Sequence, residues 1–126
     1  MNLLLDTHIF LWWNSQPTKL SKKALAAIRN PENTVYVSSA VIWEIVIKTS
    51  LGRLKAPNDP LAILYSEAFI PLSITPEHTM KLKTVEHLHG DPFDRIQIAQ
   101  AKAEGLVLVT HDRNILKYAD LQTIKS

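Results

Sequence analysis

Four acidic residues stand where a charge is unexpected, and their positions suggest shared chemistry. They are Asp6, Glu44, Asp94 and Asp112. Two of them follow apolar runs, Leu3–Leu5 and residues 106–110, and another interrupts the apolar stretch "AVIWEIVIK". A carboxylate buried among apolar residues without a partner is costly. Each of the four therefore needs a partner, and one shared partner would account for them all.

A shared metal ion is the partner that these residue types favour. Two carboxylates about 4 Å apart repel by roughly 4 kcal/mol at an effective dielectric constant near 20. Three or four of them in one pocket would need a cation or bound protons. Oxygen ligands suit Mg²⁺ and Mn²⁺, and such ions activate water and stabilise the leaving oxygen of a phosphodiester. The set therefore predicts metal-assisted phosphoryl hydrolysis.

Short apolar runs alternate with helical patterns along the chain, which is typical of an α/β domain with a mainly parallel sheet. Strands are expected near residues 3–5, 34–39, 70–74, 106–110 and 123–124. Helices are expected from Thr7, over 22–29, over 39–50, over 61–69, from Pro76, from Pro92 to Gly105 and over 114–118. Ser21, Thr75 and Asp91 are expected to cap the helices that follow them.

This arrangement would bring the four acids together. Ligands of open parallel sheets bind beyond the carboxyl ends of the strands, where the strand order reverses. Asp6 and Asp112 each follow a predicted strand, so they face the same edge of the sheet. Helices that follow strands also begin at that edge, which allows Glu44 and Asp94 to join them. The sequence predicts one acidic pocket there.

Each acid also has a purely structural explanation, and these alternatives remain open in the sequence. Asp6 could cap the next helix, and Asp112 could be a turn residue in "THDRN". Asp94 stands in the first turn of its helix, where a carboxylate favours the helix dipole. Glu44 could pair with Lys48 one turn later, although a surface pair contributes less than about 1 kcal/mol.

Composition is that of one globular domain spanning residues 1–126, with 46% hydrophobic and 21% charged residues. No apolar run approaches the roughly 20 residues that cross a bilayer, so no membrane association is expected. The absence of cysteine excludes disulfides and fits a cytoplasmic protein. Asp6 inside the first apolar stretch argues against a secretory signal.

The formal net charge of +2 does not by itself indicate nucleic-acid binding. If four of the twelve acids face a metal, the remaining eight oppose fourteen Lys and Arg residues. The rest of the surface would then be basic, which permits a polyanionic partner.

The histidines and tryptophans indicate function less clearly than the four acids do. His87 and His89 precede a helix, and without cysteine or a third nearby histidine we expect no zinc site. His111 could touch a phosphate or be an exposed turn residue. Trp12 and Trp13 are neighbours on one helix, so one is expected in the core and the other at a protein contact.

Four segments carry a family resemblance that spans nearly the whole chain: "LLLDTHIFLW", "SSAVIWEIVIK", "HGDPFDRIQIAQA" and "LVLVTHDRN". In this order they resemble the PIN domain, specifically the VapC-type toxins of type II toxin–antitoxin systems. "DPFDR" followed by an Ala-rich helix is the most specific piece. The resemblance implies a three-layer α/β/α domain with a mainly parallel central sheet flanked by helices. It also implies a Mg²⁺- or Mn²⁺-dependent endoribonuclease, dimeric and silenced by a cognate antitoxin.

By position, the resemblance assigns the catalytic and metal-binding roles to Asp6, Glu44, Asp94 and Asp112. Asp6 and Asp94 would be the main ligands, and the other two would complete the first or second shell of the metal. Thr7 and Thr110 flank the expected pocket and would orient water, although Thr7 could equally be a helix-start residue. Lys48, Arg95 and Arg113 would hold RNA phosphates, although each could equally be a solvated surface charge. Asp91 also matches the family pattern, but a helix cap is the favoured role for it.

The predicted reaction is cleavage of single-stranded or looped RNA by water, which leaves 5′-phosphate and 3′-hydroxyl ends. One alternative is a receiver-like Mg²⁺-binding signalling module. It is disfavoured because Asp6 has no adjacent acid and no lysine follows the last strand convincingly. The other alternative is a catalytically inactive binding protein, against which the intact acidic set argues.

Overall fold

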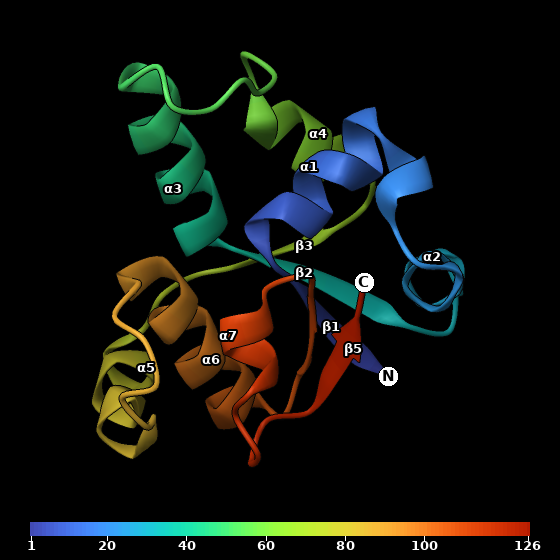
Figure 1. The fold of residues 1–126 in the computed structure, drawn as a ribbon. Helices are drawn as coiled ribbons and strands as arrows, with labels where there is room; N and C mark the ends of the chain where they lie inside the picture. The colour runs from blue at the N-terminus through green and yellow to red at the C-terminus, as the bar shows by residue number, and fades with distance from the viewer.

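A five-stranded sheet forms the centre of the computed structural model, which describes all residues 1–126 (Figure 1). Its strands are β1 (Asn2–Leu5), β2 (Thr34–Ser38), β3 (Ile70–Leu72), β4 (Val107–Thr110) and β5 (Thr123–Lys125). They are ordered β3-β2-β1-β4-β5, and every neighbouring pair is parallel. The predicted α/β fold class is confirmed. The order reverses between β1 and β4, which is where such sheets place their ligands.

This strand order contradicts the receiver-like alternative. Receiver domains have the order 2-1-3-4-5, in which the third strand lies beside the first. Here β4 occupies that place, and β3 lies at the edge of the sheet beyond β2. The signalling-module reading is therefore wrong at the level of topology.

Helices cover both faces of the sheet. They are α1 (Thr7–Ser15), α2 (Lys22–Arg29), α3 (Ser39–Ser50), α4 (Pro60–Ser66), α5 (Pro76–Lys81), α6 (Pro92–Glu104) and α7 (Arg113–Leu116), with 3₁₀ turns η1 (Pro17–Lys19) and η2 (Leu82–Thr84). Figure 1 shows α1 and α4 on one side of the sheet and α6 and α7 on the other. The predicted three layers are present. None of the helices is long and apolar enough to span a bilayer.

The buried strand β1 shows why the sheet needs both helical layers. Leu3, Leu4 and Leu5 are all fully buried. Leu3 and Leu5 join the core cluster under α1, α2 and α4, whereas Leu4 joins the opposite cluster with α6 and α7. Side chains alternate between the two faces of a strand, so a continuous apolar run marks a strand that is covered on both sides.

Capping residues set the helix starts as predicted. Ser21 Oγ accepts from the backbone N–H of Ala24, and Thr75 forms a capping box with His78. Asp91 Oδ1 accepts from the N–H groups of Phe93 and Asp94 at 2.9 and 3.1 Å. The expected cap role of Asp91 is therefore confirmed, and α6 begins where the sequence places it.

The prediction that one tryptophan of α1 lies in the core is wrong. Trp12 and Trp13 are both half-buried, and both pack against the core cluster beneath α1. Consecutive helical residues differ by about 100° around the axis, so the two rings flank the buried stripe on opposite sides. Trp12 lies beside His111, and Trp13 lies beside Phe69.

Candidate active site

Asp6 lies at the centre of the candidate site, directly after β1. Its backbone N–H still donates to Val109 O at 3.0 Å, which holds the residue at the end of the β1–β4 pair. The side chain is buried. Its Oδ1 accepts from Thr7 N at 2.8 Å, and its Oδ2 accepts from Thr110 Oγ1 at 2.8 Å. The helix-cap role foreseen for Asp6 is real and coexists with its position at the sheet edge.

Asp112 is linked to Asp6 through one hydroxyl group. The Oγ1 atom of Thr110, which donates to Asp6, accepts from the backbone N–H of Asp112 at 3.0 Å. The Asp112 carboxylate is half-buried and caps α7 by accepting from Asn114 N at 2.7 Å. The turn role foreseen for Asp112 is thus present as a cap. The helix begins at Arg113, one residue earlier than predicted.

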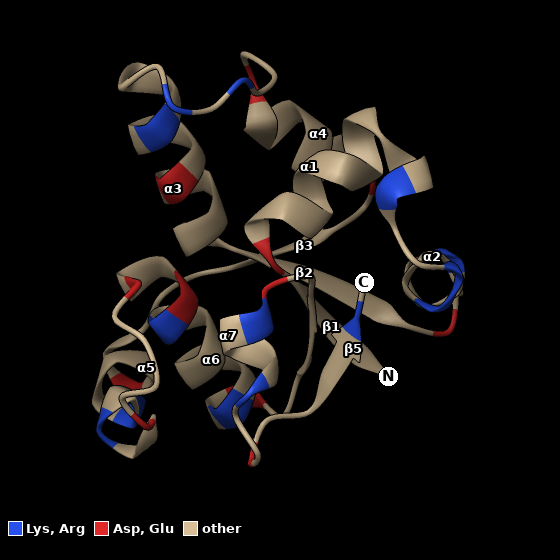
Figure 2. Cartoon of the chain, viewed as in Figure 1, with Lys and Arg blue, Asp and Glu red and all other residues tan.

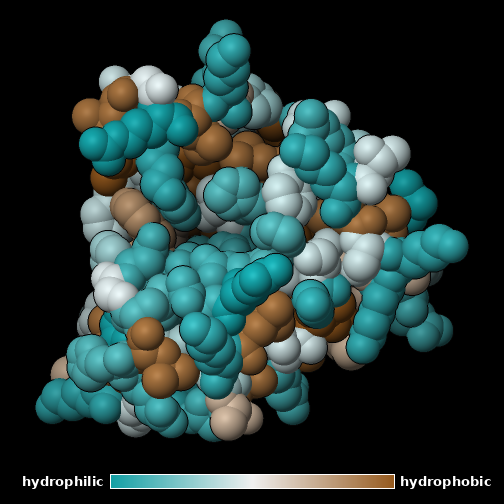
Figure 3. Space-filling model, in the orientation of Figure 1, coloured by the Kyte–Doolittle hydropathy of each residue, from teal (hydrophilic) through white to brown (hydrophobic).

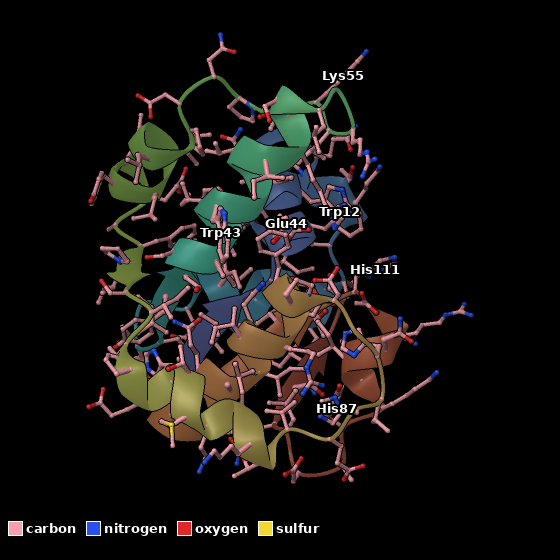
Figure 4. All side chains as sticks on the ribbon, turned by 90° about the vertical axis from the view of Figure 1, so that its left-hand side faces the viewer. Trp12, Trp43, Glu44, Lys55, His87 and His111 are labelled. Atoms are coloured by element: carbon pink, nitrogen blue, oxygen red, sulfur yellow. The ribbon has the colours of Figure 1, made fainter.

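Glu44 reaches the same site from α3. Its carboxylate is buried, and Oε1 accepts from Thr7 Oγ1 at 2.6 Å. Its Oε2 pairs with the ammonium group of Lys48, one turn later. The foreseen Lys48 pair therefore exists, but Glu44 is also bonded to the residue that follows Asp6. In Figure 4, Glu44 and Trp43 leave α3 in different directions.

Asp94 comes from the first turn of α6 and is also buried. Its Oδ2 lies 3.1 Å from His89 Nε2, and His89 Nδ1 lies 2.9 Å from the hydroxyl of Tyr118. Tyr118 donates that hydroxyl hydrogen to Glu86 O at 3.0 Å, so it accepts from His89 Nδ1–H. Consequently the hydrogen bond between His89 Nε2 and the Asp94 carboxyl contains one proton, which is bonded to one of these two groups.

The electrostatics of Asp94 show that the acids act on one another. Burial, the largest cause, and repulsion from the other acids together raise the pKa of Asp94 to about 8. The repelling groups are Asp6, Asp91, Asp112 and Glu44. Figure 2 shows acidic positions on α3, before α1 and at the start of α6 around the same end of the sheet. The four predicted residues are therefore brought together.

Asp6 responds to the same environment. Burial raises its pKa, hydrogen bonds from Thr110 and Thr7 oppose that rise, and the charge of Glu44 adds to it. Desolvation and like charges both disfavour the ionised form of a carboxyl group. A bound cation would reverse both effects, because it replaces lost water contacts and screens the repulsion.

Two residues that touch these acids were missed in the sequence. Gln97 is fully buried, and its Nε2 lies 3.5 Å from Asp6 Oδ1, while its Oε1 has no hydrogen-bond partner. It follows Asp94 by three positions, so their shared helix face could have revealed it. His89 was considered only as a zinc ligand. Its contact with Asp94 depends on the loop before α6, for which the sequence has no local signal.

Four of the five residues expected to touch substrate or water make contacts within the protein. Thr7 donates to Glu44, Thr110 donates to Asp6, and Lys48 pairs with Glu44. Arg95 donates from Nη1 to Glu86 O at 2.7 Å and from Nη2 to Val85 O at 3.2 Å, which holds the loop before α6.

Arg113 is the fifth of these residues, and it is exposed. It lines a pocket of about 460 Å³ together with Asp6, His8, His111 and Asp112. The pocket thus joins two of the acids to cationic and imidazole side chains.

The donor set fits a hard divalent cation. Four carboxylates and two hydroxyls supply oxygen ligands only, which Mg²⁺ and Mn²⁺ prefer. Gln97 Oε1 adds a buried acceptor without a partner. In the present side-chain conformations no three His, Asp or Glu groups enclose a common point close enough to hold an ion. Carboxylate rotation would therefore have to accompany binding.

Comparisons with known proteins identify the family of this chain. The family model of the PIN domain matches residues 3–121. Ribonuclease VapC22 of Mycobacterium tuberculosis (strain ATCC 25618 / H37Rv) is 30% identical over 117 residues, which cover 90% of this chain and 88% of that protein.

Solved structures share the fold. One is VapBC2 from Rickettsia felis bound to a DNA fragment from its promoter, with a TM-score of 0.72, 19% identity and coverage of 99% of this chain and 98% of that one. Another is VapBC-1 from nontypeable Haemophilus influenzae, with a TM-score of 0.64, 21% identity and the same coverage. From the family match and the coverage of its relative, this chain belongs to the PIN domain family.

Proposed function

We propose that this protein is a divalent-metal-dependent endoribonuclease and the toxin of a toxin–antitoxin pair. It would hydrolyse RNA phosphodiester bonds in the cytoplasm, as a single domain over residues 1–126. A curated relative with the name ribonuclease supports the reaction class. Mg²⁺ and Mn²⁺ are proposed from the oxygen-only donor set.

One observation carries the proposal: carboxylates from four separate elements act on one another at the topological switch point of a parallel sheet. The pKa of Asp94 is raised to about 8 by burial and then by the other acids. Among the basic side chains, Lys48 pairs with Glu44 and His89 contacts Asp94. Asp6 accepts its hydrogen bonds from neutral donors. A cation would therefore stabilise this pocket.

Different residues of the chain have different roles in the proposed reaction. Asp6 and Asp94 would be the main ligands, with Glu44 and Asp112 completing the set. When bound, a divalent ion would supply Lewis-acid activation of water and charge neutralisation at the phosphate. Thr7 and Thr110 hold Glu44 and Asp6 in place. Arg113 lines the same pocket as Asp112 and would bind a phosphate of the RNA.

The proposed partners are RNA, a cognate antitoxin and a second copy of the chain. Similar solved structures are VapBC assemblies, and one is described as a toxin–antitoxin complex from Klebsiella pneumoniae. Figure 3 shows apolar surface near α3 and α4, above a polar hollow. Trp43, Leu61 and Tyr65 are exposed on these helices, and a protein partner would remove them from water. Light scattering with and without the antitoxin measures both assemblies.

A defined RNA digest tests the reaction. Wild-type protein with Mg²⁺ or Mn²⁺ should cut single-stranded RNA and leave 5′-phosphate and 3′-hydroxyl ends, and excess EDTA should stop the cleavage. Asp6→Asn should fold and be inactive. Cleavage that persists in EDTA, or at an unchanged rate in Asp6→Asn, would falsify the proposal. Metal binding without any RNA cleavage would instead favour the inactive binding protein.

A further inference from the structure

An aromatic cluster lies beside the acids and has no part in the proposed chemistry. The ring centroids of Trp12 and His111 are 5.0 Å apart with an interplanar angle of 71°, and those of Trp12 and His8 are 5.7 Å apart. Lys19 Nζ lies 5.4 Å from the centroid of the Trp12 ring. α1, η1 and the turn after β4 thus supply one surface. In Figure 4, Trp12 and His111 lie close together, in agreement with their ring contact.

This aromatic cluster borders the acidic pocket. His8 and His111 line the same pocket of about 460 Å³ as Asp6, Asp112 and Arg113. Pockets for small organic groups commonly measure about 300–1,000 Å³. Trp12 contacts both histidines that line it. An RNA strand that places a phosphate at the acids would therefore bring a neighbouring nucleotide to the aromatic rings.

The rings are both held and accessible. Trp12 is half-buried because one part of it packs against the core cluster under α1. His111 is exposed, and its Nδ1 lies 3.1 Å from Ser126 O. His8 is exposed as well. Aromatic side chains with few freely rotating bonds bind a flat partner at low entropic cost.

We propose that Trp12 and His111, with His8 beside them, form a stacking platform for one unpaired base of the RNA next to the scissile phosphate. Lys19 and Arg113 would bind the phosphates that flank this base. The inference rests on the proposed function, because it names a subsite of the same active site. Base stacking on aromatic rings is typical of single-strand recognition. A duplex hides its base faces, so the platform makes the enzyme selective for unpaired nucleotides.

The chemistry of the surface favours RNA over a protein partner here. No hydrophobic residue lines the pocket, and Lys19 and Arg113 add positive charge. Strongly exposed apolar residues lie elsewhere, such as Trp43 on α3 and Tyr65 on α4. Polyanions are attracted by basic side chains, and each base adds a ring face for stacking.

The test compares two platform variants with matched controls. Trp12→Leu removes the ring but keeps an apolar side chain, and His111→Ala changes an exposed residue. Trp13→Leu and His87→Ala alter the same residue types away from the pocket. Kd and KM for a cleavable single-stranded RNA should rise about 5- to 150-fold in Trp12→Leu and less in His111→Ala. The controls should match the wild type, and thermal unfolding shows whether each variant folds.

Abasic RNA identifies the stacked position. Each nucleotide near the cleavage site is replaced in turn by an abasic one, and binding is measured in an Asp94→Asn background that prevents cleavage. At one position, the abasic change should weaken RNA binding by the Asp94→Asn protein. It should not weaken RNA binding by the protein that carries both Asp94→Asn and Trp12→Leu. Equal losses in both backgrounds at every position, or a Trp12→Leu effect no larger than that of Trp13→Leu, would overturn the platform.

Other results separate this inference from the proposed function. If the wild type cleaves RNA and the platform variants bind and cleave it equally well, the platform is wrong but the proposed function stands. A wild-type protein that neither binds nor cleaves RNA with Mg²⁺ or Mn²⁺ overturns both. If Trp12→Leu and His111→Ala weaken antitoxin binding but leave RNA binding intact, the surface is a protein contact and the platform is wrong.

Discussion

Thr110 donates its hydroxyl hydrogen to Oδ2 of Asp6 at 2.8 Å, and this buried bond joins the carboxyl ends of β4 and β1. The hydroxyl oxygen of Thr110, Oγ1, also accepts from Asp112 N at 3.0 Å. One hydroxyl therefore orients the central carboxylate and also holds the segment that carries Asp112. The two strands are neighbours at the point where the strand order reverses.

Replacing this hydroxyl should damage both stability and the site. Thr110→Val keeps the shape of the side chain but removes the donor to Asp6 and the acceptor for Asp112 N. An unpaired buried polar group costs about 1–3 kcal/mol, so the free energy of unfolding should fall by about that amount. Urea unfolding measures it, and Thr110→Ser, which keeps the hydroxyl, is the control. An unfolding curve identical to that of the wild type would contradict the prediction.

The raised pKa of Asp94 predicts that the metal-free protein loses stability as pH rises. The native pKa is about 8 against an ordinary value of 3.8, so the native state binds this proton more tightly than the unfolded state. Ionisation of Asp94 therefore lowers the free energy of unfolding above the pKa of the unfolded state. This loss grows by at most about 1.4 kcal/mol per pH unit, up to about pH 8. Asp94→Asn removes this titration and should be the more stable protein near pH 8.

Urea unfolding in EDTA at several pH values tests the direction in which Asp94 changes stability with pH. The stability difference between Asp94→Asn and the wild type should widen from about pH 4 to about pH 8. Asp120→Asn is a control with the same chemical change, because Asp120 is an exposed acid paired with Lys102. A stability difference that stays constant across this range would show that Asp94 titrates normally.

Lys48 should stabilise the metal-free site but oppose metal binding. Its pKa is raised first by the hydrogen bond to Glu44, and the charges of Asp91 and Asp94 add to this. Lys48→Met should therefore lower the melting temperature without metal and increase the rise in melting temperature that Mg²⁺ produces. Lys55→Met is the control, since Lys55 is exposed and lies at the far end of α3 from the site in Figure 4. Equal metal-induced rises in both variants would count against this role.

Arg95 is expected to hold the loop before α6. Its guanidinium group donates to Glu86 O and Val85 O, and this loop also carries His89. Arg95→Gln should cost about 1–3 kcal/mol of stability and speed amide hydrogen exchange across residues 85–90. Arg53→Gln, at an exposed position, is the control. Unchanged exchange together with weaker, less salt-dependent RNA binding would support phosphate contact as its main role.

The general position of the site was predictable because it depends on local patterns. An apolar run buried on both sides must be a central parallel strand, and a polar residue directly after it must lie at the ligand-binding edge. Asp6 and Asp112 follow from this rule. Asp94 follows from the cap at Asp91, which fixes the first turn of α6. The helix-cap role of Asp6 does not exclude the metal role proposed for it, because one carboxylate oxygen caps the helix while the other makes a second contact.

The rest of the site depends on contacts between distant segments. His89 contacts Asp94 through one imidazole nitrogen, and Tyr118, far along the chain, contacts the other. The aromatic cluster of His8, Trp12 and His111 forms because the turn after β4 lies beside α1. Neither contact has a fixed sequence spacing. Side-chain packing across the sheet edge decides them, and one sequence holds no signal for it.

A calorimetric titration with Mn²⁺ or Mg²⁺ tests the central claim most directly, because it measures whether the gathered carboxylates bind a metal. The wild type should bind the ion, whereas Asp6→Asn and Asp94→Asn should remain folded and lose most of the binding heat, with Asp120→Asn unchanged. No binding by the folded wild type, or equal binding by all of these proteins, would contradict a metal site at this end of the sheet.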